Sequence, residues 1–391
     1  MVTDLSVDLF DPAFYTGDPF PTYAELRRDA PVCWHEGAGL WSVARHADVM
    51  TVSRDPKTFC SGKGVLANDR GRPIAGSDSI IYLDPPDHHR YRKLVSSGFT
   101  PRRIAALESR VRELAAELLE GVEAGRPFDL VEQLSAPLPL LVIAELLGIP
   151  FDDRDRFKTW SDAVIDAADE PGEETFTIAA ELWQYFEGVI DERRRSPSGD
   201  LISVVATAEV DGELLTDLEL NGFCMTLLVA GNETTRNLIS GGVQALTEHP
   251  DQLAALAADP TLVPAAVEEM LRWVTPVLSF ARTATRDVEL GGQQVGAGDY
   301  VLMLYQSANR DEETFGPTAE RFDIGRTPNP HVAFGFGEHF CLGASLARLE
   351  ARIVFDELLR RFSTIELAGD PEWLGSTLMH SIVRLPVMLE R

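Results

Sequence analysis

Apolar residues recur at three- and four-residue steps through most of the chain, which is the spacing of amphipathic helices. This pattern predicts helices over residues 101–125, 136–150, 151–168 and 173–197. The second of these is closed by Gly148 and Pro150, two residues that end helices. Strand-like alternation is rarer and is clearest over residues 281–290 and 298–305. The pattern therefore predicts a mainly α-helical protein.

The longest periodic segment predicts one central helix. It begins at Thr216, has Glu219 three residues later as a capping box, and stops before Pro250. A helix of roughly 30 residues is ~45 Å long. Its middle, "FCMTLLVAG", is apolar all round, which predicts burial on every side. The polar "NETT" follows at once, and such groups need partners or a function inside a protein.

Residues 61–83, "SGKGVLANDRGRPIAGSDSIIYL", form a long predicted loop that is rich in glycine and polar residues. A loop of this length with some apolar content is a candidate lid over a binding site.

Composition and charge exclude several classes of function. The chain has 391 residues, of which 45% are hydrophobic, and its net charge is −27. Such an acidic surface repels phosphate backbones and anionic lipid, so we expect no nucleic-acid partner and no membrane partner. The four cysteines form no C-x-x-C pair, and the acidic N-terminal segment lacks an apolar run. These features favour a soluble cytoplasmic protein.

The segment "AFGFGEHFCLGAS", residues 333–345, carries the candidate chemistry. Apolar residues recur at helical steps after Cys341, so a helix begins at or near it. Amides at a helix N-terminus lower a thiol pKa from ~8.5 and favour thiolate. Gly335, Gly337 and Gly343 leave space for a flat ligand, as an iron porphyrin with a thiolate ligand requires. From these residues alone, a buried structural cysteine is the alternative.

The full spacing F-G-x-G-x-H-x-C-x-G is met by Phe334, Gly335, Gly337, His339, Cys341 and Gly343. This run resembles the haem-binding loop of the cytochrome P-450 family of haem-thiolate monooxygenases. Three further segments, "DPPDHHRYRKLV", "AGNETT" and "EEMLR", resemble family motifs in the family's order. The resemblance covers about residues 80 to 365, with family-like flanks. One departure is "AERF" (Ala319–Phe322) where the family has "PERF".

The resemblance implies a fold and a cofactor. The fold is mainly α with a smaller β portion near the N-terminus, and its long central helix lies over a buried haem. Because the motifs must share one haem, we expect a single domain over residues 1–391. The implied cofactor is heme b (iron protoporphyrin IX), with Cys341 as its metal ligand and with Phe334 and Gly335 beside it. We also expect a monomer.

The resemblance implies four donors for the two haem propionates, namely His88, Arg92, Arg282 and His339. Asp84 is a plausible N-cap and Pro85 suits the first helical position, so His88 and Arg92 would share one helix face. Outside this context, His88 and Arg92 would be interpreted as surface residues.

Glu269 and Arg272 match the family's E-x-x-R pair, for which the resemblance implies a buried structural role. From spacing alone they form an ordinary helix pair. The sequence leaves open whether Arg321 or Arg326 completes their cluster.

The "NETT" segment supplies the candidate catalytic residues. Thr234 can accept or relay a hydrogen bond at the oxygen site, and Glu233 can link that site to solvent as a proton relay. Gly231 leaves space there, and a threonine hydroxyl that bonds back to a carbonyl can open the helix. A polar stripe on the helix surface is the alternative interpretation.

Electrons must come from another protein, because the chain has no G-x-G-x-x-G fingerprint after a strand and no flavin or iron–sulfur ligand set. The resemblance implies a separate ferredoxin and reductase that draw on NAD(P)H, with O2 as co-substrate. Basic candidates for ferredoxin docking, each equally compatible with a solvated surface residue, are Arg348, Arg352, Lys93 and Arg103.

The expected substrate is a hydrophobic small molecule, such as a steroid, fatty acid or terpenoid. The predicted pocket residues carry no charge and are Leu227, Ala230, Gly231, Val277, Leu278, Leu378 and Met379. Residues 305–343 are most similar to actinobacterial family members that oxidise steroids and branched lipids. Macrolide or polyketide tailoring stays open. A peroxide-driven peroxygenase and a non-catalytic haem sensor are the rival functions, and neither needs the Glu233–Thr234 pair.

Overall fold

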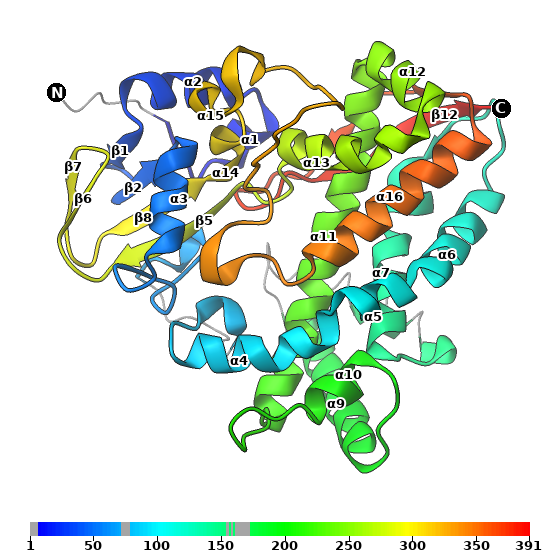
Figure 1. The fold of residues 1–391 in the computed structure, drawn as a ribbon, viewed down its shortest axis with the longest axis horizontal. Helices are drawn as coiled ribbons and strands as arrows, with labels where there is room; N and C mark the ends of the chain where they lie inside the picture. The colour runs from blue at the N-terminus through cyan, green and yellow to red at the C-terminus, as the bar shows by residue number, and fades with distance from the viewer. Residues whose placement is uncertain (1–6, 72–78, 154–155, 158, 161–172) are drawn as a thin grey trace.

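The apolar run over residues 223–231 lies in helix α11 (Asp217–Glu248), which passes through the middle of the molecule (Figure 1). Only Phe223, Cys224 and Leu228 of this run are buried, so the predicted burial on every side is only partly correct. The capping box is present, since Thr216 Oγ1 accepts from the Glu219 amide at 3.2 Å and the Glu219 carboxylate accepts from the Thr216 amide at 2.8 Å. Helices from both flanks of the sequence pack on α11, which is why it is apolar around most of its circumference.

The computed structural model describes residues 7–71, 79–153, 156–157, 159–160 and 173–391. Its other helices are α1 (Pro12–Thr16), α2 (Phe20–Asp29), α3 (His46–Arg54), α4 (Asp87–Ser96), α5 (Pro101–Ala106), α6 (Glu108–Glu120), α7 (Pro137–Leu147), α9 (Glu173–Arg195), α10 (Leu201–Ala206), α12 (Pro250–Ala258), α13 (Val263–Val274), α14 (Tyr305–Ala308), α15 (Glu312–Phe315) and α16 (Ala344–Arg361). Most of the helix predicted over residues 151–168 lies outside the described residues.

The strands are β1 (Val32–His35), β2 (Leu40–Val43), β3 (Phe59–Cys60), β4 (Phe128–Asp129), β5 (Ser279–Ala284), β6 (Val288–Leu290), β7 (Gln293–Val295), β8 (Tyr300–Leu304), β9 (Thr364–Leu367), β10 (Glu372–Trp373), β11 (Ile382–Arg384) and β12 (Pro386–Glu390). The largest sheet has five strands in the order β1-β2-β8-β5-β3. Strand β2 pairs parallel with β8, and the other neighbours in this sheet are antiparallel.

This sheet refines the expected β portion near the N-terminus. Three strands come from the first 60 residues, but β8 and β5 come from residues 279–304 and lie between them. Every residue of β8 is buried, as expected for a strand that has partners on both sides. Figure 1 shows this sheet on one side of α11, with α6, α7 and α16 on the other.

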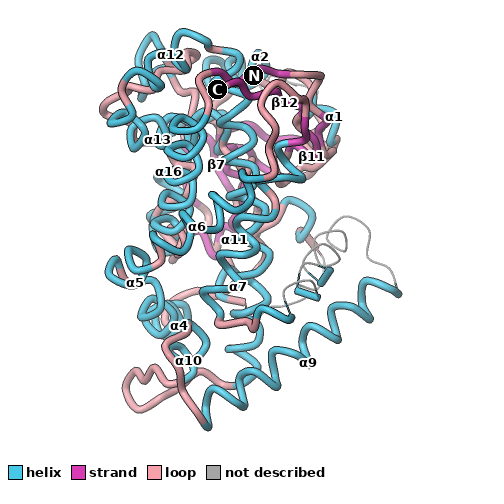
Figure 2. The backbone as a smooth tube through the Cα atoms, turned by 90° about the vertical axis from the view of Figure 1, so that its right-hand side faces the viewer, coloured by secondary structure: helices cyan, strands magenta, loops and turns pink. Residues whose placement is uncertain are grey.

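Two helix predictions show how far local signals reach. Helix α7 ends at Gly148, whose φ of 75° is the left-handed conformation that glycine adopts at low cost. The segment 101–125, predicted as one helix, is divided into α5 and α6 at Leu107. The backbone N–H of Leu107 donates to the carbonyls of Ile104 and Ala105, which ends α5, and α6 begins at the next residue. Helix α9 follows its prediction and lies at the end of the molecule opposite the termini (Figure 2). None of the described helices is long and apolar enough to cross a membrane.

Candidate active site

A cavity lies between α11 and the Cys341 loop. Its volume is about 250 Å³. Along α11 its wall is formed by residues 226, 227, 230, 231, 234, 235 and 238, a continuous helical stripe. Facing side chains are mostly apolar and include Ile80, Phe99, Ile143 and Val277. Cys341 and Gly343 lie on the same cavity, so the apolar pocket and the thiol belong to one site.

The glycines of the cysteine loop have different roles. Gly335 and Gly337 have φ values of 66° and 76°, where a side chain is strained. A Cβ on Gly337 would lie 2.2 Å from the Ser53 carbonyl oxygen of α3, so Gly337 is required by chain packing. A Cβ on Gly343 would lie 4.0 Å from the Cys341 sulfur. Among the three, Gly343 therefore fits best the expected role of keeping space beside the thiol.

The Cys341 thiol is held by its loop and by α16. Its backbone N–H donates to the Phe334 carbonyl at 2.9 Å, which closes the loop. Burial raises the pKa of the thiol, and this outweighs the opposing effects of the Gly343 and Ala344 amides and of Arg92. The amides lower this pKa, as expected, but the effect of burial is larger. A metal ion bound to such a sulfur deprotonates it directly, so the site fits a metal-bound thiolate.

Four basic side chains converge on one part of the cavity wall, and they are His88, Arg92, Arg282 and His339. His88 is buried, neither of its ring nitrogens has a hydrogen-bond partner, and its ring centre lies 4.3 Å from that of His339. Arg92 and Arg282 each donate to a carbonyl at 2.7 Å, but neither forms an ion pair with a described residue. Their convergence, expected from sequence, is thus present.

The positive charge of this basic cluster is carried by Arg92 and Arg282, which form no ion pair with a described residue. Burial lowers the pKa values of Arg92 and Arg282. The pKa of His339 falls to about 2, because of burial and then the charges of Arg282, His88 and Arg92. A ligand with carboxylates would supply the missing partners through charge-assisted hydrogen bonds. The thiol, the apolar walls and this cluster therefore fit a haem with two propionates.

Asp84 does not cap α4 as predicted. Helix α4 begins at Asp87, with Pro86 at the N-cap position, so Pro85 is not its first helical residue either. The Asp84 carboxylate instead accepts from the amides of Ser61 at 2.7 Å and Gly62 at 3.0 Å. The amides of Ser61 and Gly62 thus take the place of the first amides of α4 as donors to this carboxylate. The contact joins the beginning of the 61–83 loop to the segment before α4. His88 and Arg92 remain four residues apart on α4, as predicted.

The two candidate catalytic residues of the "NETT" segment have different surroundings. Thr234 lines the cavity, and its Oγ1 donates to the Ala230 carbonyl four residues earlier at 2.7 Å. Glu233 is buried away from the cavity wall and forms an ion pair of 2.6 Å with Arg236. Arg236 in turn donates to Ser381 Oγ at 2.7 Å.

Comparisons with known proteins agree with this geometry. The family model "Cytochrome P450" matches residues 257–387. Putative cytochrome P450 126 of Mycobacterium tuberculosis is 43% identical, over 98% of this chain and 97% of its own length. The chain belongs to the cytochrome P450 family.

Two further relatives extend the comparison. The methyl-branched lipid omega-hydroxylase of Mycobacterium bovis is 40% identical, over 93% of this chain and 90% of its own length. The crystal structure of CYP109E1 from Bacillus megaterium in complex with testosterone is 38% identical and has a TM-score of 0.87, covering 95% of this chain and 99% of that one. The enzyme class of this P450 is therefore that of the haem-thiolate monooxygenases. Its fold is the one expected from the sequence.

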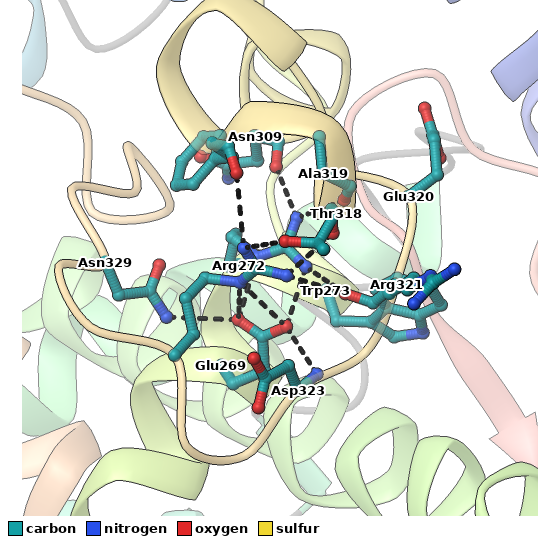
Figure 3. Close-up of polar contacts among 12 residues, drawn as sticks. Glu269, Arg272, Trp273, Asn309, Thr318, Ala319, Glu320, Arg321, Asp323 and Asn329 are labelled. Carbon is teal, nitrogen blue, oxygen red and sulfur yellow. Dashed lines mark hydrogen bonds and ion pairs between the residues drawn. The ribbon is translucent and has the colours of Figure 1, made fainter.

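The E-x-x-R pair of this P450 forms a buried cluster (Figure 3). Arg272 donates to both Glu269 oxygens, at 2.8 and 2.7 Å, and both residues are fully buried. Arg326 Nε adds contacts of 3.1 and 3.3 Å to the same carboxylate. Arg321 contributes only its carbonyl, which accepts from Arg272 and Arg326. Arg326, rather than Arg321, therefore completes the cluster with its side chain.

Not every predicted pocket residue of this P450 reaches the cavity. Leu227, Ala230, Gly231 and Val277 line it. Leu278 is fully buried behind the wall, and its amide donates to the Leu378 carbonyl at 2.8 Å. Met379 pairs with Val277 through a β-bridge, and neither Leu378 nor Met379 is among the lining residues.

The basic residues suggested for partner docking differ in how free they are. Arg348 donates to Glu268 at 2.6 and 2.8 Å, and Arg103 donates to the Gly199 carbonyl at 2.6 Å. Arg352 lines a small cleft together with Arg112 and Asp356. Lys93 is exposed.

Burial tends to raise the pKa of Glu268, but hydrogen bonds from Arg348 and His331 outweigh it and lower that pKa to about 2.

Sequence analysis missed Glu350, which lines the cavity from α16. It is almost fully buried, its Oε2 has no hydrogen-bond partner, and burial raises the pKa of its carboxyl. A signal was present, because Glu350 follows Leu346 and precedes Val354 at four-residue steps on the apolar face of α16.

Proposed function

We propose that this P450 holds heme b through Cys341 and hydroxylates a hydrophobic small molecule with electrons from a separate ferredoxin and its NAD(P)H-dependent reductase. The whole chain serves as one monomeric catalytic domain in the cytoplasm. The observation that carries the proposal is one cavity that has a thiol, apolar walls and a basic cluster without ion pairs among the described residues.

Cys341 is the metal ligand, and Phe334, Gly335 and Gly343 shape the space around its sulfur. His88, Arg92, Arg282 and His339 bind the propionates, since they line one part of the cavity and neither arginine forms an ion pair with a described residue. The bound haem supplies the activation of O2, which the thiolate favours by donating electron density. The remaining steps belong to the side chains of α11 and of the cavity wall.

Thr234 and Glu233 control protons. The hydrogen of Thr234 Oγ1 is directed to the Ala230 carbonyl, so its lone pairs can accept a hydrogen bond at the reaction site. Glu233 delivers protons from the side of Arg236 and Ser381, because its carboxylate is held there by a short ion pair. The Glu233–Thr234 pair favours a monooxygenase over a peroxygenase or a sensor, since neither rival needs a proton supply at this point.

The substrate is a steroid, fatty acid, branched lipid or terpenoid. Leu227, Ala230, Gly231 and Val277 contact it, and these uncharged residues favour a neutral or amphipathic molecule. A relative named for methyl-branched lipids supports the branched-lipid class, and a structural neighbour solved with testosterone supports the steroid class. Macrolides belong in the same screen, because a polyketide product is the alternative substrate.

Cys341→Ser tests the ligand assignment. The variant should fold, because the side chain changes by one atom and the loop is closed by backbone bonds. The reduced carbon monoxide complex should lose the absorption typical of a thiolate ligand, while far-ultraviolet circular dichroism stays unchanged. Cys224→Ser, a buried cysteine away from the cavity lining, serves as the control and should keep that absorption. A thiolate spectrum in Cys341→Ser contradicts the proposal.

A screen of steroids, fatty acids, terpenoids and macrolides then tests the substrate class. Binding is followed by the change in haem absorption, and product formation is measured with a ferredoxin, its reductase and NAD(P)H. Only molecules that shift the absorption and yield hydroxylated product support the proposed activity. Product formed with peroxide alone, at the same rate and without the ferredoxin, would favour the peroxygenase instead.

A further inference from the structure

One hydroxyl pair, in which Thr226 lines the cavity and Ser79 lies behind it, has no role in the proposed proton supply. Thr226 lines the cavity from α11, eight residues before Thr234. Its Oγ1 lies 3.0 Å from Oγ of Ser79, which immediately precedes the lining residues Ile80 and Ile81. The surrounding wall is apolar, so this pair is a local polar group in a hydrophobic pocket.

The hydrogen bonds of the pair fix what it can offer a ligand. A hydroxyl has one hydrogen and two lone pairs. Thr226 Oγ1 donates its hydrogen to the Gly222 carbonyl at 2.7 Å. Ser79 must therefore be the donor in the bond to Thr226. Both hydrogens are then used, while lone pairs remain on both oxygens, so the pair can accept a hydrogen bond but has none to donate.

We infer that Ser79 and Thr226 form a specificity site for the hydroxyl group of a hydrophobic substrate. A substrate hydroxyl donates to the pair, whereas a ketone or ether oxygen finds no donor unless an existing bond breaks. Thr226 and Thr234 are about 12 Å apart along α11, at 1.5 Å per residue. The favoured substrate is therefore a sterol or long-chain alcohol oxidised about 12 Å from its hydroxyl. This inference rests on the proposed function, because it takes oxidation to occur beside Thr234.

The test uses the haem-loaded protein and two isomeric probes, tetradecanol and methoxytridecane, which differ in whether the oxygen carries a hydrogen. A steroid alcohol and its methyl ether form a second matched pair. Titrations followed by haem absorption give the dissociation constants. We expect the protein to bind each alcohol about five-fold more tightly than its ether, the size of one net hydrogen bond.

Three variants locate that preference. Thr226→Val and Ser79→Ala should bind the alcohol and the ether equally, because each removes one member of the pair. Thr51→Val is the matched control. Its hydroxyl makes the same type of bond, to the Ala47 carbonyl at 2.9 Å, but lies on α3 away from the cavity lining. This control should keep the preference for the alcohol.

Several results overturn the inference. They are equal affinity for alcohol and ether in the parent protein, an unchanged preference in both pocket variants, or no absorption change with either alcohol. The reduced carbon monoxide spectrum separates these results from a failure of the proposed function. If the parent keeps its thiolate spectrum, only the hydroxyl site is wrong; if that spectrum is missing, the haem-thiolate proposal itself fails.

Discussion

Replacing Arg272 by leucine should destabilise this P450 far more than its single charge suggests. Arg272 neutralises Glu269 through two hydrogen bonds, and its other nitrogen contacts reach the Asn309, Ala319 and Arg321 carbonyls, each at 2.8 Å. Breaking one side of a buried ion pair costs about 3–5 kcal/mol, because the remaining charge stays out of water. That is a large part of the 5–15 kcal/mol, roughly, by which proteins are stable.

A second substitution in the cluster should be milder. Arg326→Leu removes its contacts to Glu269, Thr318 and Arg321 but leaves Glu269 paired with Arg272, so the loss is that of hydrogen bonds and amounts to about 1–3 kcal/mol. The control is Arg384→Leu, which breaks an ion pair of 2.8 Å to Glu372 on the surface. An exposed pair of this kind contributes only about 0.2–1 kcal/mol.

Urea unfolding of the haem-loaded variants measures this order. Circular dichroism and haem absorption should be recorded together, because a bound cofactor can separate the loss of helix from the loss of haem. The expected loss of unfolding free energy is largest for Arg272→Leu, intermediate for Arg326→Leu and smallest for Arg384→Leu. If Arg272→Leu is no more harmful than Arg384→Leu, burial of the cluster does not determine its contribution and the reasoning is wrong.

Three further predictions concern the site and its support. Thr234→Ala should keep haem binding and substrate-induced spectral shifts but consume NAD(P)H with more hydrogen peroxide and little product; full coupling of NAD(P)H to product would exclude Thr234 from proton transfer. Glu268→Gln should flatten the acid limb of stability, because a folded pKa of about 2 stabilises the protein above the ordinary value of 4.5 and this contribution is lost as pH falls from 4.5 toward 2; an unchanged acid limb in urea melts refutes this. Gly337→Ala should lower stability and haem retention, since its Cβ meets the Ser53 carbonyl, whereas Gly343→Ala should keep the fold and alter the thiolate spectrum; the reverse pattern would contradict the roles assigned to these glycines.

The features predicted correctly from sequence depend on neighbouring residues. The capping box at Thr216 and Glu219 uses residues that are three apart in the sequence. The end of α7 at Gly148 is likewise local. The family motifs extended these predictions to the cysteine loop, because the spacing of the motif indicates which residues lie around the sulfur.

The errors came from contacts that span long stretches of chain. Asp84 has the residue type of an N-cap, but amides more than 20 residues earlier use its carboxylate. Gly337 resembles a glycine that makes room for a ligand, yet its nearest obstacle is Ser53 of α3. The sequence also could not decide between Arg321, which lies within the "AERF" segment, and Arg326, which follows it. Only the fold determines which of the two side chains reaches Glu269.

The basic cluster shows why a cofactor site is difficult to recognise from its residues one at a time. His88, Arg92, Arg282 and His339 come from distant segments, and each alone has the chemistry of an ordinary surface residue. Together they form a largely buried basic wall, in which Arg92 and Arg282 carry positive charge without an ion pair among the described residues. Such a wall costs folding free energy until an anionic ligand compensates it. Haem binding must therefore stabilise the folded chain by more than its apolar contacts alone provide, because the ligand supplies the missing charges to the native state only.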